Sequence, residues 1–506
     1  MKKLSWLEYQ GLNGFQKFIY NLIRFFCAIP TVIANIGKAI GRGVKKAALA
    51  VGRELKDIVM TFVKGSWRTK ISYLVLGFGN ITVGQIVRGV LFLAFEVVFF
   101  FYTITTGSYW IGKLGTLGDT PSQDVYNEVL DTYVRVEGDD SFRILLYGIL
   151  SLFFVLVFIF AWRMSIKQSR ENDMLLAAGK KVPHFKDDLK AIVDEKFHVT
   201  LLSIPVLGIT LFTVLPIVFM IIIAFTSYDG AHDGYSNLFT WVGWANFKEL
   251  FSSGTSGLGY AFKKILGWTF VWAFFATFSN YILGMIVAIM INKKGIKFKK
   301  MWRGIFVLTI AIPQFISLLY MSKLFAKNGL INAFLLKTGI LSTAFDFWAN
   351  TGSARVLVIL INIWIGIPYL MLMATGILMN IPEDLYESAK IDGANAVQQF
   401  FKITLPYMLF VTGPYLLTSF IGNMNNFNVI FLLTGGAATN PDLTTSGGTA
   451  TDVDLLITWL FKITTGAQSN YKLASVIGIM IFIVVATLSV IGFNVMPSNK
   501  NEEDFQ

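Results

Sequence analysis

Asn380-Ile-Pro-Glu-Asp-Leu-Tyr-Glu-Ser-Ala-Lys-Ile-Asp-Gly-Ala-Asn-Ala-Val-Gln-Gln-Phe-Phe-Lys-Ile-Thr-Leu-Pro406 is a polar segment between two long apolar runs. Asn380 and Glu383 have the spacing of a capping box, so we expect a helix to begin here. Apolar residues then recur near helical spacing, but Asp392-Gly393 interrupts the pattern. The segment therefore predicts two short helices joined by a tight turn, with one apolar face lying against a membrane.

The composition is typical of a polytopic membrane protein. Hydrophobic residues make up 54% of the 506 residues, charged residues only 15%, and the mean hydropathy is +0.60. Cys27 is the single cysteine, which excludes a disulfide framework, and the scattered histidines and acids form no metal-ligand or catalytic pattern. We therefore expect no enzymatic activity, no metal and no cofactor in this chain. Most of the net charge of +12 lies in residues 1–70, which favours an anionic membrane surface over nucleic acid.

Eight apolar runs have the length needed to cross a bilayer, which predicts an all-α polytopic fold. They lie at about 85–104, 144–162, 200–226, 266–291, 304–324, 355–379, 407–433 and 472–495. Loop 292–303 carries six Lys/Arg and no acid, whereas loop 105–143 carries seven acids against three Lys/Arg. The positive-inside rule makes the first loop cytoplasmic and the second external. Both termini and the 380–406 stretch are then expected in the cytoplasm.

These spans divide the chain into five predicted regions. They are a basic amphipathic interfacial segment at 1–80, two additional spans with an external loop at 85–162, a cytoplasmic linker at 163–199, a transmembrane core at 200–495 and a cytoplasmic tail at 496–506. A further span near 19–36 is the alternative for the first region, but Arg24 and Pro30 count against it.

The 380–406 stretch resembles the EAA loop of ABC importer permeases. The matching residues are Glu387, Ser388, Ala389, Asp392, Gly393, Ala394, Ile403, Leu405 and Pro406. The resemblance implies that this loop docks in a groove of an ATPase subunit, with Glu387 pairing with a basic group and Gly393 permitting the turn. An amphipathic connector in the headgroup layer is the alternative reading of the same residues.

The resemblance covers about 200–495 and is greatest to the MalF type of maltose-importer permease. It is carried by Pro216, Ala224-Phe-Thr-Ser-Tyr228, Trp241-Val-Gly-Trp-Ala-Asn-Phe247, Ile312-Pro-Gln-Phe-Ile-Ser-Leu-Leu319, Gly329-Leu-Ile-Asn332 and Leu433-Thr-Gly-Gly436. It implies a type I ABC importer permease fold in a bacterial cytoplasmic membrane, importing maltose or maltodextrins. The implied partners are a second, MalG-like permease, a pair of ATPase subunits that hold ATP-Mg, and an extracellular sugar-binding protein.

Other transport functions are kept as alternatives. A relative of this family could import a raffinose-type or galacto-oligosaccharide. An ion-coupled secondary transporter would need acids embedded in the membrane, and among the predicted spans only Glu96 qualifies. We expect Glu96 to be protonated or paired within its helices rather than to act in transport.

Two predicted spans carry polar residues on one helical face, which suggests a sugar site. Amides that both donate and accept hydrogen bonds, beside aromatic rings, suit a neutral oligosaccharide. Spacing alone leaves interhelical packing equally open. The resemblance favours substrate contact, because these segments are similar to those that line the maltose site in MalF-type permeases. The candidate residues are Asn362, Gly366 and Tyr369 in the sixth span, and Ser419, Asn423, Asn426 and Phe427 in the seventh.

Three positions depart from the MalF-type pattern near the expected site. Gly422 stands where an aromatic residue is usual, and Ile310 and Gln314 stand where tyrosine and serine are usual. A reshaped site is therefore expected. The external loop at 227–265 also lacks the large extracytoplasmic domain of MalF-type permeases, which suggests a lipid-anchored binding protein that docks on short loops.

Overall fold

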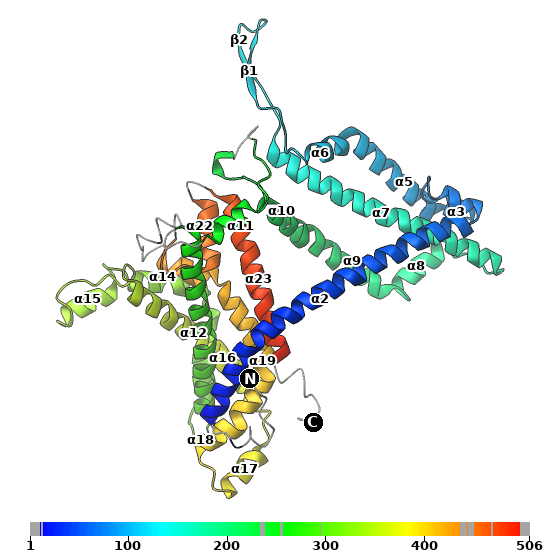
Figure 1. Cartoon of the computed structure of the whole chain (residues 1–506). Coiled ribbons are helices and arrows are strands. Elements are labelled where there is room, and N and C mark those ends of the chain that lie inside the picture. Colours follow the sequence, from blue (N-terminus) through cyan, green and yellow to red (C-terminus); the bar gives the residue numbers. More distant parts are fainter. Residues whose placement is uncertain are drawn as a thin grey trace. The chain divides into compact units, whose positions relative to one another are not determined.

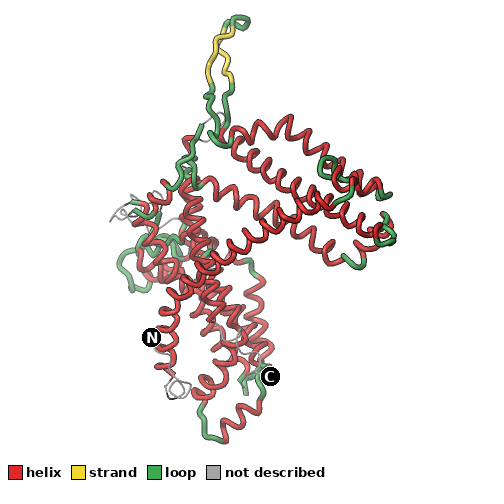
Figure 2. Tube along the Cα trace, turned by 45° about the vertical axis from the view of Figure 1, so that its right-hand side comes forward, coloured by secondary structure: helices red, strands yellow, loops and turns green. Residues whose placement is uncertain are grey.

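The computed structural model describes residues 11, 14–232, 238–252, 257–293, 295–435, 443, 450–466 and 469–495. Within these residues the chain is helical apart from one two-stranded hairpin and its loops (Figures 1 and 2). It divides into two compact units, one made of residues 37–245 and the other of residues 1–36 and 246–506.

Seven helical segments of the described chain are long and apolar enough to cross a membrane, or eight if a bent pair counts as one span. The predicted all-helical polytopic fold is confirmed, and eight is the upper count. The seven are Ile86–Lys113, Ser141–Ala177, Phe197–Ile223, Leu258–Asn292, Thr351–Leu378, Ala396–Met424 and Tyr471–Phe493.

The predicted fifth span, 304–324, is not one continuous helix. Helix α13 (Lys299–Ala311) and helix α14 (Gln314–Leu324) meet at a bend of 87°. Pro313 has no backbone N–H and disfavours helical geometry in the residue before it, and Ile312 is accordingly extended with ψ of 122°. The Ile312-Pro313 pair therefore breaks the span.

The predicted seventh span, 407–433, has different boundaries. Helix α18 (Ala396–Gln399) continues through a π-helical stretch, η4 (Phe400–Thr404), into α19 (Leu405–Met424). A separate helix, α20 (Phe427–Thr434), then begins, with the Asn426 side chain accepting a hydrogen bond from the Val429 N–H at 3.2 Å. Asn426 acts as a helix cap, so the long apolar run is divided here.

The unit of residues 37–245 contains the greater part of helix α2 (Gly14–Lys64) and three apolar helical segments. Its remaining elements are α3 (Trp67–Ile71), α4 (Phe78–Thr82), α5 (Ile86–Tyr102), η1 (Thr103–Gly107), α6 (Ser108–Lys113), β1 (Gln123–Asn127), β2 (Thr132–Val136), α7 (Ser141–Ala177), α8 (Phe185–Val193), α9 (Phe197–Ile209), η2 (Thr210–Val214), α10 (Leu215–Ile223) and η3 (Gly230–His232). Strands β1 and β2 pair antiparallel, with Val125 opposite Val134.

Glu96 lies in α5 and is only 6% exposed. One of its carboxylate oxygens accepts a hydrogen bond from the Leu76 backbone N–H at 2.8 Å. The residue therefore satisfies a buried backbone donor at the end of a short loop, as a structural carboxyl does. Glu96 is thus paired inside the protein as expected, but its partner lies in the loop between α3 and α4 rather than in a helix.

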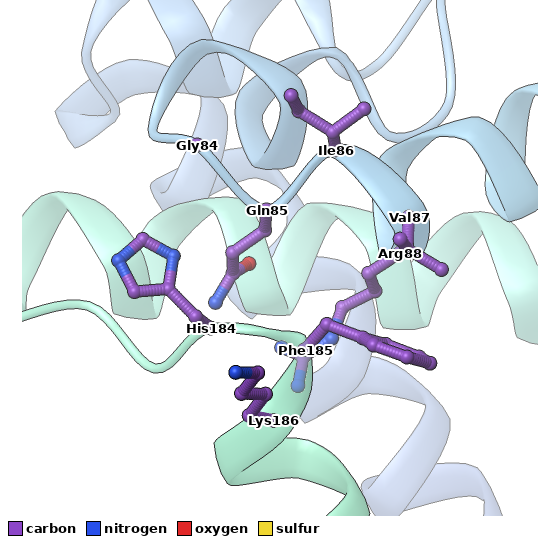
Figure 3. Close-up of a pocket in the computed structure, with 8 residues that line it drawn as sticks. All are labelled: Gly84, Gln85, Ile86, Val87, Arg88, His184, Phe185 and Lys186. Atoms are coloured by element: carbon purple, nitrogen blue, oxygen red, sulfur yellow. The ribbon is translucent and has the colours of Figure 1, made fainter.

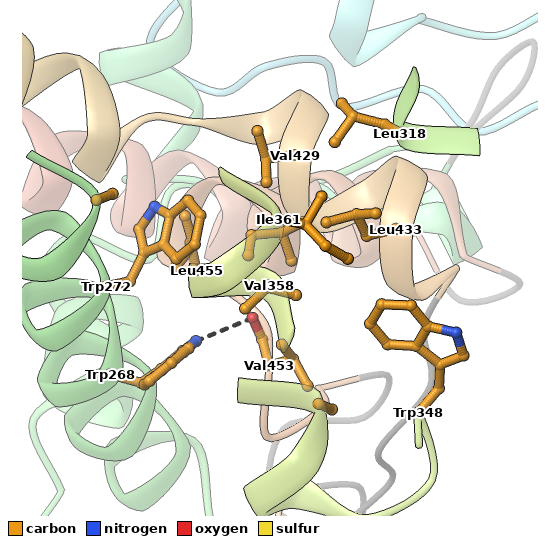
Figure 4. Close-up of a cluster of buried hydrophobic side chains, with 13 residues drawn as sticks. Trp268, Trp272, Leu318, Trp348, Val358, Ile361, Val429, Leu433, Val453 and Leu455 are labelled. Carbon is orange, nitrogen blue, oxygen red and sulfur yellow. Dashed lines mark hydrogen bonds between the residues drawn. The ribbon is translucent and has the colours of Figure 1, made fainter. Parts of the chain in front are cut away.

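The other unit is organised around helix α12 (Leu258–Asn292), which packs against α16 (Thr351–Leu378) and α19. Two apolar clusters lie along α12. One gathers Trp268, Trp272, Val358 and residues of α20 and the 453–455 loop, and the Trp268 indole N–H donates to the Val453 carbonyl at 3.1 Å (Figure 4). The second contains Tyr281, Met285, Leu370, Met371 and Met408. The remaining elements are α11 (Ala245–Leu250), α15 (Leu330–Lys337), α17 (Glu383–Ile391), α22 (Leu456–Thr465) and α23 (Tyr471–Val495).

Candidate functional site

The 380–406 stretch forms the predicted helix-turn-helix, and its turn is made by Gly393. Gly393 has a φ of +78°, a left-handed conformation that glycine adopts without strain. Its N–H donates to the Lys390 carbonyl at 3.0 Å, and the Ala394 N–H donates to the Ala389 carbonyl at 2.8 Å. These two bonds are those of a Schellman motif, which ends α17 and satisfies its last carbonyls.

The predicted capping box at the start of this loop is wrong. Helix α17 begins at Glu383 with Pro382 in the cap position, and no side chain caps it. A capping box forms instead at the second helix, where Asn395 and Gln398 exchange hydrogen bonds of 2.8 and 2.9 Å. Asn395 and Gln398 have the same spacing as Asn380 and Glu383, so the sequence pattern could also have predicted this second capping box.

The two arms of the loop are joined by a side-chain hydrogen bond. The Tyr386 hydroxyl in α17 lies 2.9 Å from the Thr404 hydroxyl in η4. The loop also exposes apolar side chains, with Ile391 at its tip 87% exposed and Val397 63% exposed. Glu387, on α17, is exposed as well. An exposed apolar tip beside a carboxylate is the surface expected of a segment that inserts into a partner.

The predicted polar face of α16 is turned toward α12. Asn362 is 6% exposed, and its backbone carbonyl faces the Asn280 amide of α12 at 3.5 Å. A Cβ atom added at Gly366 would lie 2.6 Å from the Asn280 side chain, so glycine is needed for this close approach. Asn280 was not predicted. Its amide oxygen is buried and has no hydrogen-bond partner within the described residues.

The predicted polar face of α19 also meets α12. The Asn423 amide donates to the Thr277 hydroxyl of α12 at 3.0 Å, and the Trp272 indole N–H donates to the Asn423 carbonyl at 3.0 Å. Thr277 was not predicted either. Thr277 and Asn280 form with Asn362, Gly366 and Asn423 a polar layer around the middle of α12, between its two apolar clusters.

The other predicted residues lie outside this polar layer. Tyr369 is 55% exposed, and Ser419 is half-buried and hydrogen-bonded to Tyr415. Phe427 stacks on Phe431, with ring centroids 4.8 Å apart. The structure thus brings Asn362, Gly366 and Asn423 together through α12, but it does not bring all seven candidates around one cavity.

The residues at the three departures from the family pattern face outward in this chain. Ile310 is exposed on α13, and Gln314 is exposed at the start of α14. Gly422 is exposed on α19, and a Cβ added there would meet no atom within 4 Å. The Gly422 position therefore has room for a larger side chain.

A cavity of about 350 Å³ lies in the other unit, between the start of α5 and the start of α8 (Figure 3). It is lined by Gly84, Gln85, Ile86, Val87, Arg88, His184, Phe185 and Lys186. The cationic side chains and single aromatic ring do not resemble a neutral sugar site, so we do not assign the substrate here.

The β1–β2 hairpin is held at its base by Asp139. This carboxylate accepts hydrogen bonds from Lys113 Nζ at 2.7 Å and from the backbone N–H groups of Asp119 and Thr120 at 2.9 and 3.1 Å. Burial by itself would raise the pKa of Asp139, but these hydrogen bonds outweigh it and hold the pKa well below its ordinary value. The anchor is therefore ionised at neutral pH.

No group of three or more His, Cys, Asp or Glu residues in the described part of the chain is arranged to hold a metal ion. The described residues form an exposed helix-turn-helix loop near the ends of α16 and α19 and a neutral polar layer at the middle of these helices. Such an arrangement suits conformational coupling rather than bond-making chemistry.

Comparison with known proteins shows where this arrangement belongs. The model of the binding-protein-dependent transport system inner membrane component family matches residues 280–497. The maltodextrin transport system permease protein MdxF of Bacillus subtilis is 31% identical, covering 88% of this chain and 98% of that protein. The maltodextrin transport system permease protein MalC of Streptococcus pneumoniae is 33% identical, covering 83% of this chain and 93% of that protein. The galactooligosaccharides transport system permease protein GanP of Bacillus subtilis is 31% identical, covering 85% and 97%.

These relatives match the chain over nearly their whole length, and the residues matched by the family model include α16, α19 and the 380–406 loop. They are transport subunits and not enzymes, in agreement with the prediction for this chain. The chain therefore belongs to the family of membrane permease subunits of binding-protein-dependent ABC importers that includes these maltodextrin and galactooligosaccharide permeases.

Proposed function

We propose that this chain conducts maltodextrins and forms half of the translocation path beside a second, MalG-like permease. The observation that carries the proposal is the short connection between the loop and the polar layer on both arms. Only residues 379–382 separate α16 from α17, and α18 runs through η4 into α19 as one helical segment, Ala396–Met424. Gly366 lies about 12 residues from the end of α16, or about 18 Å along its axis. Rigid helices can transmit a movement of the loop over that distance.

The loop is proposed to couple this chain to a pair of ATPase subunits that hold ATP-Mg. Ile391 and Val397 supply an apolar surface for a groove of the ATPase, and Glu387 pairs with a basic group at its edge. Closure of the ATPase pair would pull the loop, and α16 and α19 would switch the path between inward-facing and outward-facing states. ATP hydrolysis is thus assigned to the ATPase subunits and not to this chain.

Substrate contact is proposed for the seven polar and aromatic candidates of α16, α19 and α20. Tyr369 is the exposed member of the set, and Ser419 is half-buried, so we assign Tyr369 the contact with sugar rings and Ser419 a contact with a sugar hydroxyl. Asn362, Gly366 and Asn423 would shape the path from within the polar layer. The amides of this set are uncharged, which suits a neutral oligosaccharide.

The choice of maltodextrin over another oligosaccharide rests on relatives. MdxF and MalC carry maltodextrin in their names, whereas GanP, which is as similar to this chain as MdxF, carries galactooligosaccharides. A galacto-oligosaccharide is therefore the second candidate. The exposed Gly422 leaves space in the α19 surface that either sugar could occupy.

The orientation and the external partner are also proposals. Both termini and the 380–406 loop are placed in the cytoplasm by the positive-inside rule. The β1–β2 hairpin and its Asp139 anchor would then face outward, where we propose that a lipid-anchored sugar-binding protein docks.

Uptake by cells tests the function directly. Cells that contain the full importer should accumulate labelled maltodextrin, chemically unchanged, and uptake should stop on ATP depletion but persist under an uncoupler of proton and sodium gradients. Competition by unlabelled galacto-oligosaccharide distinguishes the two substrates. Uptake of the galacto-oligosaccharide alone would refute the maltodextrin assignment, and dependence on an ion gradient would refute the importer mechanism.

A further inference from the structure

The part of α2 from Gly37 to Lys64, here called the surface helix, has two opposite faces. Val44, Val51, Leu55 and Phe62 recur at intervals of seven and four residues and so share one side of the helix. These four side chains are 47 to 65% exposed. The basic side chains of Lys38, Arg42, Lys45, Lys46, Arg53, Lys56 and Lys64 are exposed around the opposite side.

A third side of the surface helix is tied to α7 by ion pairs. Arg163 of α7 donates to Glu54 at 2.6 Å and also pairs with Asp57, and Lys167 lies 3.0 Å from Glu54. The hydrogen bond from Arg163, and then that from Lys167, lower the pKa of Glu54. Glu54 and Asp57 are the only acids of the surface helix. Their charges are matched by α7, so the outward charge of this helix is positive.

The ion pairs also fix the depth of the surface helix relative to the bilayer. Arg163 directly follows the apolar run of α7 that ends at Trp162, so it lies where the hydrocarbon layer ends. The Trp162 indole N–H donates to the Tyr73 carbonyl at 3.0 Å, and the two rings pack edge to face. Aromatic residues of this kind are enriched at the membrane–water interface.

The direction of the surface helix agrees with this depth. Figure 1 shows α2 running obliquely to α7, and the ion pairs of Arg163 with Glu54 and Asp57 mark a place where the two helices meet. A helix that crosses a spanning helix at the polar boundary lies close to the plane of the membrane surface. Its apolar face can then enter the acyl boundary while the basic face remains at the level of the headgroups.

We propose that the surface helix Gly37–Lys64 binds the bilayer surface and recognises anionic phospholipid headgroups. The apolar face supplies burial, and the seven Lys/Arg supply attraction to negative headgroups on the same leaflet. Charge complementarity selects the lipid surface over an apolar protein groove, because seven exposed Lys/Arg side chains are spread from Lys38 to Lys64, although Leu49, Met60 and Val63 are exposed among them. This inference does not depend on the transported sugar.

Spin-label accessibility in the full importer tests the placement of the helix. Labels at Val51→Cys and at Arg53→Cys, each in a Cys27→Ser background, report opposite faces of the same turn. In nanodiscs that contain phosphatidylglycerol, the Val51 label should be accessible to oxygen and the Arg53 label to a water-soluble nickel chelate. Equal access of the nickel chelate to both labels would refute membrane binding. Exclusion of both reagents from the Val51 label would show that a protein covers the face, which also refutes the proposal.

The dependence on headgroup charge tests the recognition. Lys46→Gln with Lys56→Gln should raise the water-accessible fraction of the Val51 label about fivefold for each charge removed in phosphatidylglycerol nanodiscs. The same pair should have no such effect in neutral phosphatidylcholine. Lys327→Gln with Lys337→Gln removes equal charge from the other compact unit, before α15 and at its last residue, and should leave the label unchanged. An equal response in both lipids would refute anionic recognition.

Discussion

The turn at Gly393 can be perturbed in a graded way, because its requirement is purely conformational. Gly393 has a φ of +78°, and a Cβ added there meets no atom within 4 Å. Alanine should therefore introduce only left-handed backbone strain, about 1 to 2 kcal/mol. That energy corresponds to a decrease of about five- to thirtyfold in the population of the turned loop. Asparagine tolerates this conformation far better than alanine.

Proline at position 393 should have the largest effect. Its ring holds φ near about −65°, which is incompatible with the turn, and it removes the N–H that donates to the Lys390 carbonyl. We expect Gly393→Asn to keep most of the coupling, Gly393→Ala to lose much of it and Gly393→Pro to abolish it.

The assay is ATP hydrolysis by the reconstituted importer, stimulated by its binding protein and sugar, with the melting temperature of the complex as a folding control. Binding-protein docking should be unchanged in all three variants. If side-chain size alone mattered, alanine would couple better than asparagine. That order, or normal coupling with proline, would refute the role of the Gly393 turn.

Three further perturbations follow from contacts elsewhere in the chain. Gly366→Leu should lower the melting temperature of the complex, because the Cβ atom alone would lie 2.6 Å from the Asn280 side chain. Overpacking of this kind costs about 1 to 3 kcal/mol. An unchanged melting temperature would contradict the close approach of α16 to α12. Tyr386→Phe removes the bond to Thr404 and should weaken the loop by about 1 kcal/mol, seen as faster hydrogen exchange in α17 without a change in the spans. The pKa of Asp139 is depressed, so its charge stabilises the hairpin base above the ordinary carboxyl pKa of about 4, and this stabilisation is lost as pH falls through that value toward the folded pKa. The resistance of the hairpin to protease should thus be constant between about pH 7 and pH 5 and decrease below about pH 4. The Asp139→Asn variant should be cleaved readily at every pH. The same dependence of cleavage on pH in both proteins would contradict the role of Asp139 as an anchor.

The turn of the 380–406 loop could be predicted from sequence, whereas its capping box was predicted at the wrong helix. The Asp392-Gly393 turn depends on residues within one helical turn of each other, so its residues were sufficient to predict it. The capping pattern occurs twice, at Asn380 and at Asn395, and only the helix boundary decides which one forms. Pro382, which precedes α17, moved that boundary beyond the first pattern.

Only part of the polar layer could be predicted from the sequence. Asn362 and Asn423 were predicted because each lies on a polar face of an apolar span. Thr277, Asn280 and Gly284 of α12 also share one helical face and could have indicated it, but a threonine and an asparagine in a long helix are ordinary residues until their neighbours are known. Their contacts with α16 and α19 join residues more than 80 positions apart.

The sequence by itself determined most of the apolar spans and the turn of the 380–406 loop. A bilayer demands about 20 apolar residues for each crossing, and this requirement is satisfied within a short stretch of chain. Only the tertiary structure decided how each helix is rotated about its own axis. Hydropathy does not constrain that rotation, but side-chain packing does, and it turned Gly366 toward Asn280 and Asn423 toward Thr277 of α12.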